Sequence, residues 1–192
     1  MNAKLTILVL CMAIVFGGCS TAPEKPEAKA VLSAQVNEAT AVFKEKDPGI
    51  QGFYEKSYGY VVLPKVFKGA FWLGGAYGKG EVFEKGVMVG YCDMSQATLG
   101  FSFGGEYFRE IVFLRDKSDL DKFRTGEYTF SAQATGVAAT AGAAAKADYK
   151  AGMAVFITTD KGLMVDASLG GQKFKYISAA MVESPAKMKT NY

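Results

Sequence analysis

The feature that most restricts the fold of this sequence is an alternation of bulky and small side chains between residues 70 and 105. It occurs in three runs, at residues 70–78, 87–92 and 98–104. Successive side chains of a strand point to opposite faces, so this period of two predicts β-structure. Glycine weakens a strand interior, and its repetition on one face predicts that another backbone approaches closely there. We therefore expect an α+β protein built on a strongly curved antiparallel β-sheet or a small β-barrel.

Two turns are expected between these runs. Glu84–Gly86 supplies a glycine between the first two runs, and Asp93–Gln96 supplies turn-forming Asp and Ser before the third. The glycine run Gly74–Gly80 lacks the spacing of a phosphate-binding loop, because Lys79 is followed by glycine instead of Ser or Thr. These glycines are therefore assigned to strand geometry.

Residues 1–18 have the properties of a signal peptide. Lys4 provides a positive start, and the apolar run Leu5–Phe16 is too short to span a bilayer as a helix. Small residues directly precede Cys19, which resembles the bacterial lipobox, where the thiol is acylated and the Cys becomes the new N-terminus. Ser20 resembles the outer-membrane sorting pattern. We expect palmitate at Cys19 and attachment to the periplasmic face of the outer membrane; the alternative is an ordinary secreted protein that is cut nearby.

The remaining chain divides into three parts. Residues 19–30 are expected to form a flexible, extended tether because they are polar and contain two prolines. Residues 31–183 are long enough for one domain with a core of its own, and residues 184–192 form a polar tail that we expect to be frayed.

Charge and composition exclude several kinds of function. The formal net charge is +3 for the whole chain and +2 once Lys4 leaves with the signal peptide, which argues against a nucleic-acid partner. The chain has no histidine, so His-containing catalytic triads and His-ligated zinc are excluded. After removal of Cys11 and acylation of Cys19, Cys92 is left alone, and neither an intramolecular disulfide nor a thiolate metal site is expected.

We accordingly expect no cofactor, no metal and no catalytic residue. An enzyme that uses a carboxylate pair remains a minority interpretation, because carboxylates at strand ends and turns are normally solvated. The residues that it would draw on are Glu81, Glu84, Asp93, Glu106 and Asp166.

An amphipathic helix is predicted from Val31 to Lys46, and Asp47–Gly49 ends it. Two interpretations of its apolar face remain open. The face packs on the sheet, or it lies on lipid as an interfacial helix, although its polar face is not strongly basic. The residues of this face are Leu32, Val36, Ala39 and Phe43.

A strand is predicted at residues 58–63 and is expected to end at Pro64. Residues 65–69 are then expected to form a loop in which Lys65 and Lys68 flank Phe67. Such loops are mostly solvated, but clustered lysines are also a weak indication of contact with an anionic lipid headgroup or phosphate.

Several further elements are expected along the chain. They are a loop or short helix at 48–56, a strand at 111–114, and a helix at 119–124 that is capped by Ser118 and ended by Gly126. Residues 128–135 alternate as a strand does, and residues 136–147 can be either strand or helix. A hairpin is expected from 153–158 and 163–169, followed by a last strand at 173–177.

Read together and in order, several of these pieces resemble the SYLF domain family, also called the Ysc84 actin-binding domain. The similarity covers roughly residues 31–176, and Ser102 stands where the family has Gln. The resemblance implies a β-rich domain with flanking helices. In eukaryotic relatives it implies binding to phosphoinositide membranes through an N-terminal amphipathic helix, and to actin, whereas bacterial relatives are often lipoproteins. The segments that carry it are Gly59–Pro64, Gly74–Gly80, Phe130–Ala134 and Lys161–Gly171.

The resulting expectation is a non-catalytic lipoprotein with a SYLF-like, lipid-binding domain. Membrane lipid is the expected partner, whereas actin is an unlikely one in the periplasm. The alternative is an envelope scaffold that binds a protein partner through a sheet edge or the loop at 65–69, with the acyl chains as its sole lipid contact. The residues assigned to lipid binding are Leu32, Val36, Phe43, Lys65, Phe67 and Lys68.

Overall fold

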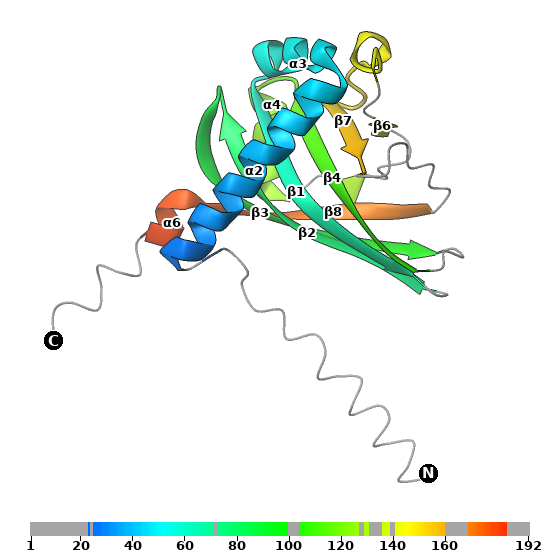
Figure 1. The fold of residues 1–192 in the computed structure, drawn as a ribbon. Coiled ribbons are helices and arrows are strands. Elements are labelled where there is room, and N and C mark those ends of the chain that lie inside the picture. The colour runs from blue at the N-terminus through cyan, green and yellow to red at the C-terminus, as the bar shows by residue number, and fades with distance from the viewer. Residues whose placement is uncertain are drawn as a thin grey trace, which may run out of the picture.

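The computed structural model describes residues 23, 25–70, 73–99, 104–126, 129–130, 136–138, 141–159 and 169–183. The predicted signal peptide, Cys19 and the tail at 184–192 lie outside the described residues. The described chain forms an α+β fold around one sheet, which confirms the predicted class (Figure 1).

The sheet has eight strands in the order β5-β8-β3-β2-β1-β4-β7-β6. All pairs are antiparallel except β6 with β7. The described strands do not close into a barrel, because β5 and β6 are the two edges of the sheet. The strands are β1 (Gly59–Ala70), β2 (Leu73–Glu84), β3 (Val87–Leu99), β4 (Gly104–Leu114), β5 (Thr129–Phe130), β6 (Gly136–Ala138), β7 (Met153–Thr158) and β8 (Leu169–Ser178).

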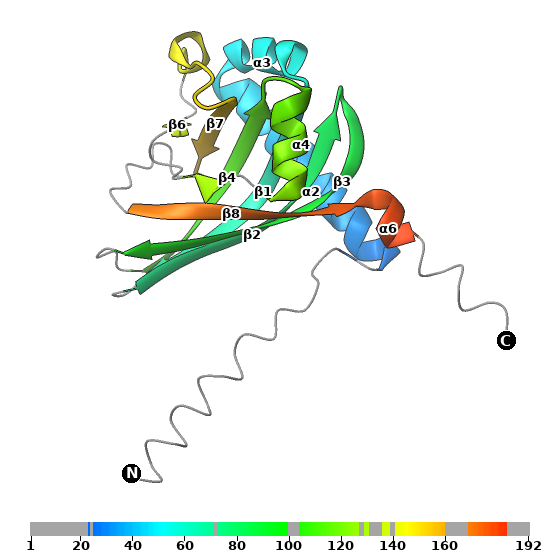
Figure 2. The same ribbon diagram turned by 180° about the vertical axis from the view of Figure 1, so that it is seen from behind.

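Strong curvature of the sheet follows from one contact across its inner side. β4 and β8 are separated in the sheet by β1, β2 and β3, yet the side chains of Glu110 and Gln172 meet at 3.0 Å. Figure 2 shows α4 (Lys117–Thr125) on this concave side, and Figure 1 shows α2 (Pro26–Lys46) across the convex side. The other helices are η2 (Pro48–Ile50), α3 (Gln51–Lys56), η3 (Ala144–Lys146) and α6 (Ala179–Glu183).

The apolar face of α2 packs on the sheet. Leu32, Val36, Ala39 and Phe43 are at most 8% exposed and belong to a cluster with strand residues such as Phe113. The interpretation in which this face packs on the sheet is confirmed. The assignment of Leu32, Val36 and Phe43 to lipid binding is wrong for this structure, because their side chains are already covered by protein.

Helix α2 begins at Pro26, five residues before the predicted start at Val31, so residues 26–30 are not part of an extended tether. Proline is well tolerated in the first turn because its fixed φ suits a helix and its missing N–H has no intrahelical acceptor there. The residues after it (Glu27, Ala28, Lys29 and Ala30) all favour helix.

The turn at Glu84–Gly86 is confirmed. Lys85 and Gly86 have φ values of 49° and 80°, as the two central residues of a tight hairpin turn require. The turn predicted at Asp93–Gln96 is wrong, because β3 continues to Leu99 and Asp93 pairs with β2 on one side and β8 on the other. The third predicted run falls mostly on residues 100–103, which lie outside the described residues.

The predicted strand end at Pro64 and the loop at 65–69 are also wrong. Strand β1 continues to Ala70, with register shifts against both neighbours between Val62 and Val66. Proline cannot donate a ladder hydrogen bond, and a bulge is one of the few places where a strand accommodates it. Lys65 and Phe67 therefore lie on a strand.

The predictions after β4 were partly correct. Helix α4 has Asp116 as its N-cap instead of Ser118, since the Asp116 carboxylate accepts a hydrogen bond from the Asp119 N–H, and Gly126 ends the helix with a φ of 73°. Of the two possibilities for residues 48–56, the short helix is present, as η2 and α3. The strand at 153–158 and the last strand at 173–177 are confirmed. Within residues 136–147, Gly136–Ala138 form strand β6 and Ala144–Lys146 form the 3₁₀ helix η3. Residues 131–135 and the hairpin turn at 160–162 lie outside the described chain.

Two glycines of β2 show why the concave face needs small residues. A Cβ on Gly80 would lie 2.3 Å from the Val62 carbonyl oxygen, and one on Gly78 would lie 2.8 Å from the Val66 side chain. The bulged part of β1 occupies the space that these side chains would need. The predicted close approach of another backbone is thus present.

We expect Gly80→Ala to lower the free energy of unfolding by about 1–3 kcal/mol, because the new methyl group meets backbone that cannot move independently. Urea unfolding measures this change. Gly52→Ala is the matched control, since nothing lies within 4 Å of its added Cβ and alanine favours helix α3. Equal stability of Gly80→Ala and the unmodified protein would show that the two strands are not this close.

Candidate functional site: an aromatic and basic patch on the convex face

The part of the convex face that α2 leaves uncovered carries a row of three aromatic side chains. Phe67 of β1 is the register partner of Tyr77 on β2 and of Tyr107 on β4. Their exposed fractions are 45%, 43% and 52%, although side chains of this size are normally buried. The rings of Phe67 and Tyr107 are 5.2 Å apart.

Cationic residues lie on the same face, beside the aromatic row. Lys65 pairs with Lys79, which pairs with Asp93, which in turn pairs with Lys175. Lys173 extends the aromatic row through Ser95, the register partner of Tyr77. We define the convex patch as Lys65, Phe67, Tyr77, Lys79, Tyr107, Arg109, Lys173 and Lys175.

Contacts within the patch hold several of these side chains in place. The Lys65 ammonium lies 4.3 Å from the centre of the Tyr107 ring, which is the geometry of a cation–π interaction. The Tyr77 hydroxyl donates to the Asp93 carboxylate at 3.4 Å. Arg109 forms an ion pair with Glu38 of α2 at 3.2 Å, and this ion pair links the helix to the edge of the patch.

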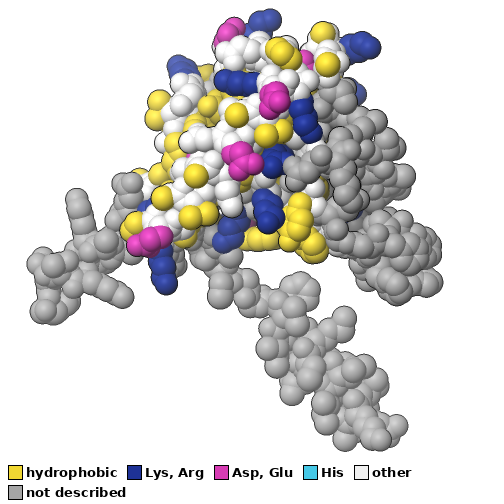
Figure 3. Space-filling view, in the orientation of Figure 1, with side chains coloured by type: hydrophobic (Ala, Val, Ile, Leu, Met, Phe, Trp, Pro, Cys, Tyr) yellow, Lys and Arg dark blue, Asp and Glu magenta, His cyan; other side chains and the backbone are white. Residues whose placement is uncertain are grey.

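The patch has an excess of positive charge. Five cationic side chains belong to it, and Glu38 and Asp93 are carboxylates of the described chain that contact or pair with them. A hollow of about 300 Å³ lies where α2 meets the patch, and Gln35, Lys65, Tyr107 and Arg109 are among its lining residues. Figure 3 shows hydrophobic and cationic side chains next to one another below α2.

Two of the predicted lipid-binding residues, Lys65 and Phe67, are exposed and belong to the patch. Lys68 does not belong to it, because strand alternation places its side chain on the concave face, where it is 6% exposed and has interactions of its own. Sequence reasoning missed the other six residues of the patch, which are Tyr77, Lys79, Tyr107, Arg109, Lys173 and Lys175. Their proximity depends on strand register, for which a single sequence contains no direct signal.

The candidate catalytic carboxylates that the structure describes each contact a different partner and do not face one another as a pair. Glu81 is buried and accepts a hydrogen bond from Ser33 of α2; burial raises the pKa of its carboxyl group, and the Ser33 bond partly offsets this. Asp93 contacts Tyr77, the side chain of Glu106 is not described, and Asp166 lies outside the described residues. Within the described residues, no three His, Cys, Asp or Glu side chains are grouped as a metal site would require.

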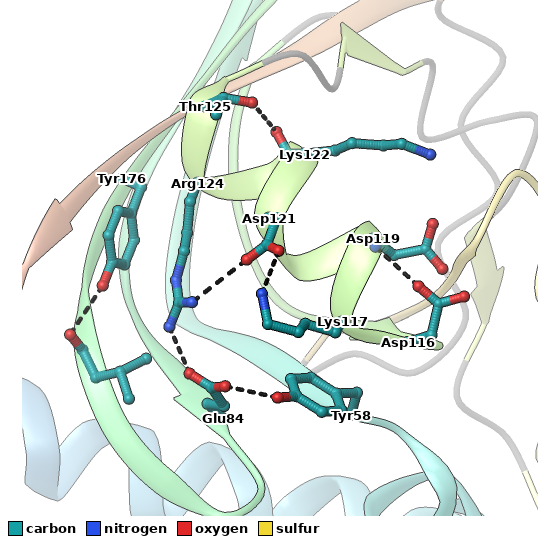
Figure 4. Close-up of polar contacts among 11 residues, drawn as sticks. Tyr58, Glu84, Asp116, Lys117, Asp119, Asp121, Lys122, Arg124, Thr125 and Tyr176 are labelled. Carbon is teal, nitrogen blue, oxygen red and sulfur yellow. Dashed lines mark hydrogen bonds and ion pairs between the residues drawn. The ribbon is translucent and has the colours of Figure 1, made fainter.

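Glu84 belongs to a polar network that ties α4 to the sheet (Figure 4). Its carboxylate accepts hydrogen bonds from Arg124 at 2.7 Å and from the Tyr58 hydroxyl at 2.9 Å. These two donors, Arg124 first, lower the pKa of Glu84. Arg124 also contacts Asp121 in α4. Because each of these groups is engaged by another, we assign the network to stability.

Comparison with known proteins gives one distant similarity. The chain is 28% identical over 149 residues to "Beta cell expansion factor A" of Aeromonas veronii. The match covers 77% of this chain but 57% of that protein, so the chain spans little more than half of the relative's length. No protein-family model matches the chain. The similarity is consistent with the resemblance to the SYLF family.

The described helices include none that is both long and apolar enough to cross a membrane.

We expect Arg124→Met to lower the free energy of unfolding by about 1 kcal/mol at pH 7, because it removes a half-buried ion pair. Since folding lowers the pKa of Glu84, this pair stabilises the protein above the ordinary value of 4.5 and its contribution is lost as the pH falls below that value. A double-mutant cycle with Glu84→Gln, measured by urea unfolding at pH 7 and pH 3, tests this. No coupling at pH 7 would contradict the assignment.

Proposed function

We propose that this chain is a non-catalytic lipoprotein that binds the surface of the membrane to which it is anchored. Acyl chains on Cys19 hold it on the periplasmic face of the outer membrane, and the convex patch contacts anionic lipid headgroups. The observation that carries this proposal is the row of three half-exposed aromatic rings beside five cations on one uncovered face.

The composition of the patch suits the boundary between lipid and water. Tyrosine is enriched at that boundary because its ring is apolar and its hydroxyl is polar. Lysine side chains lay their methylene groups along apolar surface and keep the ammonium group near phosphates. Each Lys or Arg close to an anionic surface contributes about 1 kcal/mol.

The resemblance to the SYLF family supports the lipid-binding part of this proposal. In eukaryotic members, the resemblance assigns membrane contact to an N-terminal amphipathic helix. Here the corresponding helix has its apolar face against the sheet, so we assign the contact to the convex patch instead. We favour an anionic bilayer over a protein partner because the convex patch has an excess of positive charge. The tests below also distinguish a protein partner.

Flotation with vesicles tests the headgroup contact. The full chain carrying Cys19→Ser, and therefore without acyl chains, is expected to float with vesicles of phosphatidylethanolamine and phosphatidylglycerol. Substituting the exposed patch lysines 65, 173 and 175 with Gln is expected to weaken binding by about 3 kcal/mol, or roughly a hundredfold. The matched control substitutes Lys56, Lys122 and Lys146, which are exposed but lie outside the patch, and should bind as before.

The controls distinguish the alternatives. Binding should fall when salt is added, because salt screens the attraction between the patch cations and the anionic headgroups. Binding should also fall when the vesicles consist of neutral phosphatidylcholine, because anionic headgroups are then absent. If the unacylated chain does not float with anionic vesicles, the headgroup contact is wrong. If cross-linking in cells then captures one dominant protein through the patch, the envelope-scaffold alternative is correct.

Acylation is tested separately, by labelling cells with palmitate. The full chain is expected to take up label and to fractionate with the outer membrane, and Cys19→Ser should lose both properties. Cys92→Ala is the control, because Cys92 is 1% exposed in the core and should not affect labelling. Unlabelled wild-type protein would rule out the acyl anchor while leaving the patch to be judged by flotation.

A further inference from the structure

A pair of polar side chains connects β4 and β8 across the concave interior. Glu110 of β4 and Gln172 of β8 are both fully buried. The Gln172 side-chain amide donates to Glu110 Oε2 at 3.0 Å and approaches Gln96 Oε1 of β3 at 3.4 Å. Since three strands separate β4 from β8 in the sheet, this contact closes the curved sheet over its own core.

Each residue of this pair has one buried side-chain oxygen without a hydrogen bond in the described chain. Glu110 Oε1 and Gln172 Oε1 are both buried, and neither has a hydrogen-bond partner among the described residues. If Glu110 were ionised, it would have no hydrogen to donate, so Glu110 Oε1 and Gln172 Oε1 would both stay without a hydrogen bond. Unsatisfied polar atoms are costly in a protein interior. A neutral carboxylic acid has one O–H group. An acid and a primary amide commonly pair through two hydrogen bonds, and the two unpaired oxygens are the atoms that the second bond would join.

The surroundings of Glu110 also favour the neutral form. Leu63 of β1 and Ile157 of β7 are its register partners. On β3, the nearby Cys92 is buried, and burial above all raises the pKa of its thiol, so this neighbour favours no negative charge. Lys68 of β1 is on the same face as Glu110, but its register partner on β4 is residue 106. On β2, the positions that face the bulged part of β1 are the glycines Gly78 and Gly80, which carry no charge.

Most described charged groups of the neighbouring elements are oriented away from Glu110. On strands β4 and β8, Arg109, Lys173 and Lys175 alternate to the convex face, as does Asp93 on β3. From α4, Leu120 and Phe123 belong to the concave core, whereas the buried Asp119 lies 3.5 Å from Arg115. Burial raises the pKa of Glu110 to about 7, and the hydrogen bond from Gln172 partly offsets this effect.

We propose that Glu110 is a neutral carboxylic acid in the folded protein, that it pairs with Gln172 through two hydrogen bonds, and that loss of its proton loosens the contact between β4 and β8. The concave interior is then closed more tightly in mildly acidic surroundings than in alkaline ones. This inference is independent of lipid binding.

The sign of the pH dependence follows from linkage. The folded protein holds the Glu110 proton more strongly than the unfolded chain does, for which the ordinary pKa is 4.5. The stabilisation is therefore complete below pH 4.5, declines between pH 4.5 and about 7, and is lost above that range. Within this range the folding equilibrium constant falls by up to about tenfold for each pH unit.

The variant Glu110→Gln tests the pairing. Its amide can donate where the acid donates and cannot ionise, so both hydrogen bonds are retained at every pH. Urea unfolding of the full chain with Cys19→Ser, between pH 5 and pH 8, should show stability that declines more steeply with Glu110 than with Glu110→Gln, in which Glu81 is left as the carboxyl group with a raised pKa. Glu81→Gln is the matched control, because Glu81 is buried on the other face and its loss should leave the Glu110-dependent decline in place.

Infrared spectroscopy gives a second, direct measurement. The spectrum of the protein at pH 5 minus that at pH 8 should contain the C=O stretch of a protonated carboxylic acid, and this band should be absent from Glu110→Gln. Parallel pH profiles for the two proteins, or no such band at pH 5, would overturn the proposal. If Glu110→Gln fails to fold, the same pair of spectra is recorded for Glu81→Gln, because Glu81 is the other carboxyl group of the described chain whose pKa is raised by burial; a band at pH 5 that is lost by pH 8 in this variant then decides the matter.

Discussion

The close approach of β1 to β2 is the constraint on which the other features depend. At Gly80 the backbone of β1 lies where a side chain would otherwise be, so the two strands can meet closely only because this position has no Cβ. The bulge in β1 occurs at the same place and bends the strand. Together they curve the sheet, and the curvature brings β8 over β4. The result is one face that closes on a core and one that faces outward.

These two faces have different chemistry because strand alternation separates the residues of each strand. On β1, Val66 packs in the concave core, while Lys65 and Phe67 reach the convex surface. On β8, Phe174 is in the core, and the lysines on either side of it are exposed. Helix α2 covers part of the convex face with its apolar side chains and leaves the rest open. The patch is thus what remains of the convex face beyond the reach of α2.

The sequence allowed parts of this arrangement to be predicted. The spacing of Leu32, Val36 and Phe43 indicated a helix with one apolar face, and the alternation with glycine indicated a curved sheet. Asp93–Gln96 was misread as a turn because polar residues on an exposed strand face look like those of a turn. The patch and the burial of Glu110 were not predictable, because both depend on which strands are neighbours and in which register.

The early start of α2 has a geometric consequence. Six residues lie between Cys19 and Pro26, and the seven Cα–Cα steps that join them span at most about 25 Å. An acyl group at Cys19 would therefore confine the folded body to a thin layer next to the bilayer. Such confinement raises the local concentration of headgroups around the protein, so that a contact too weak to recruit a free protein from solution is occupied for much of the time.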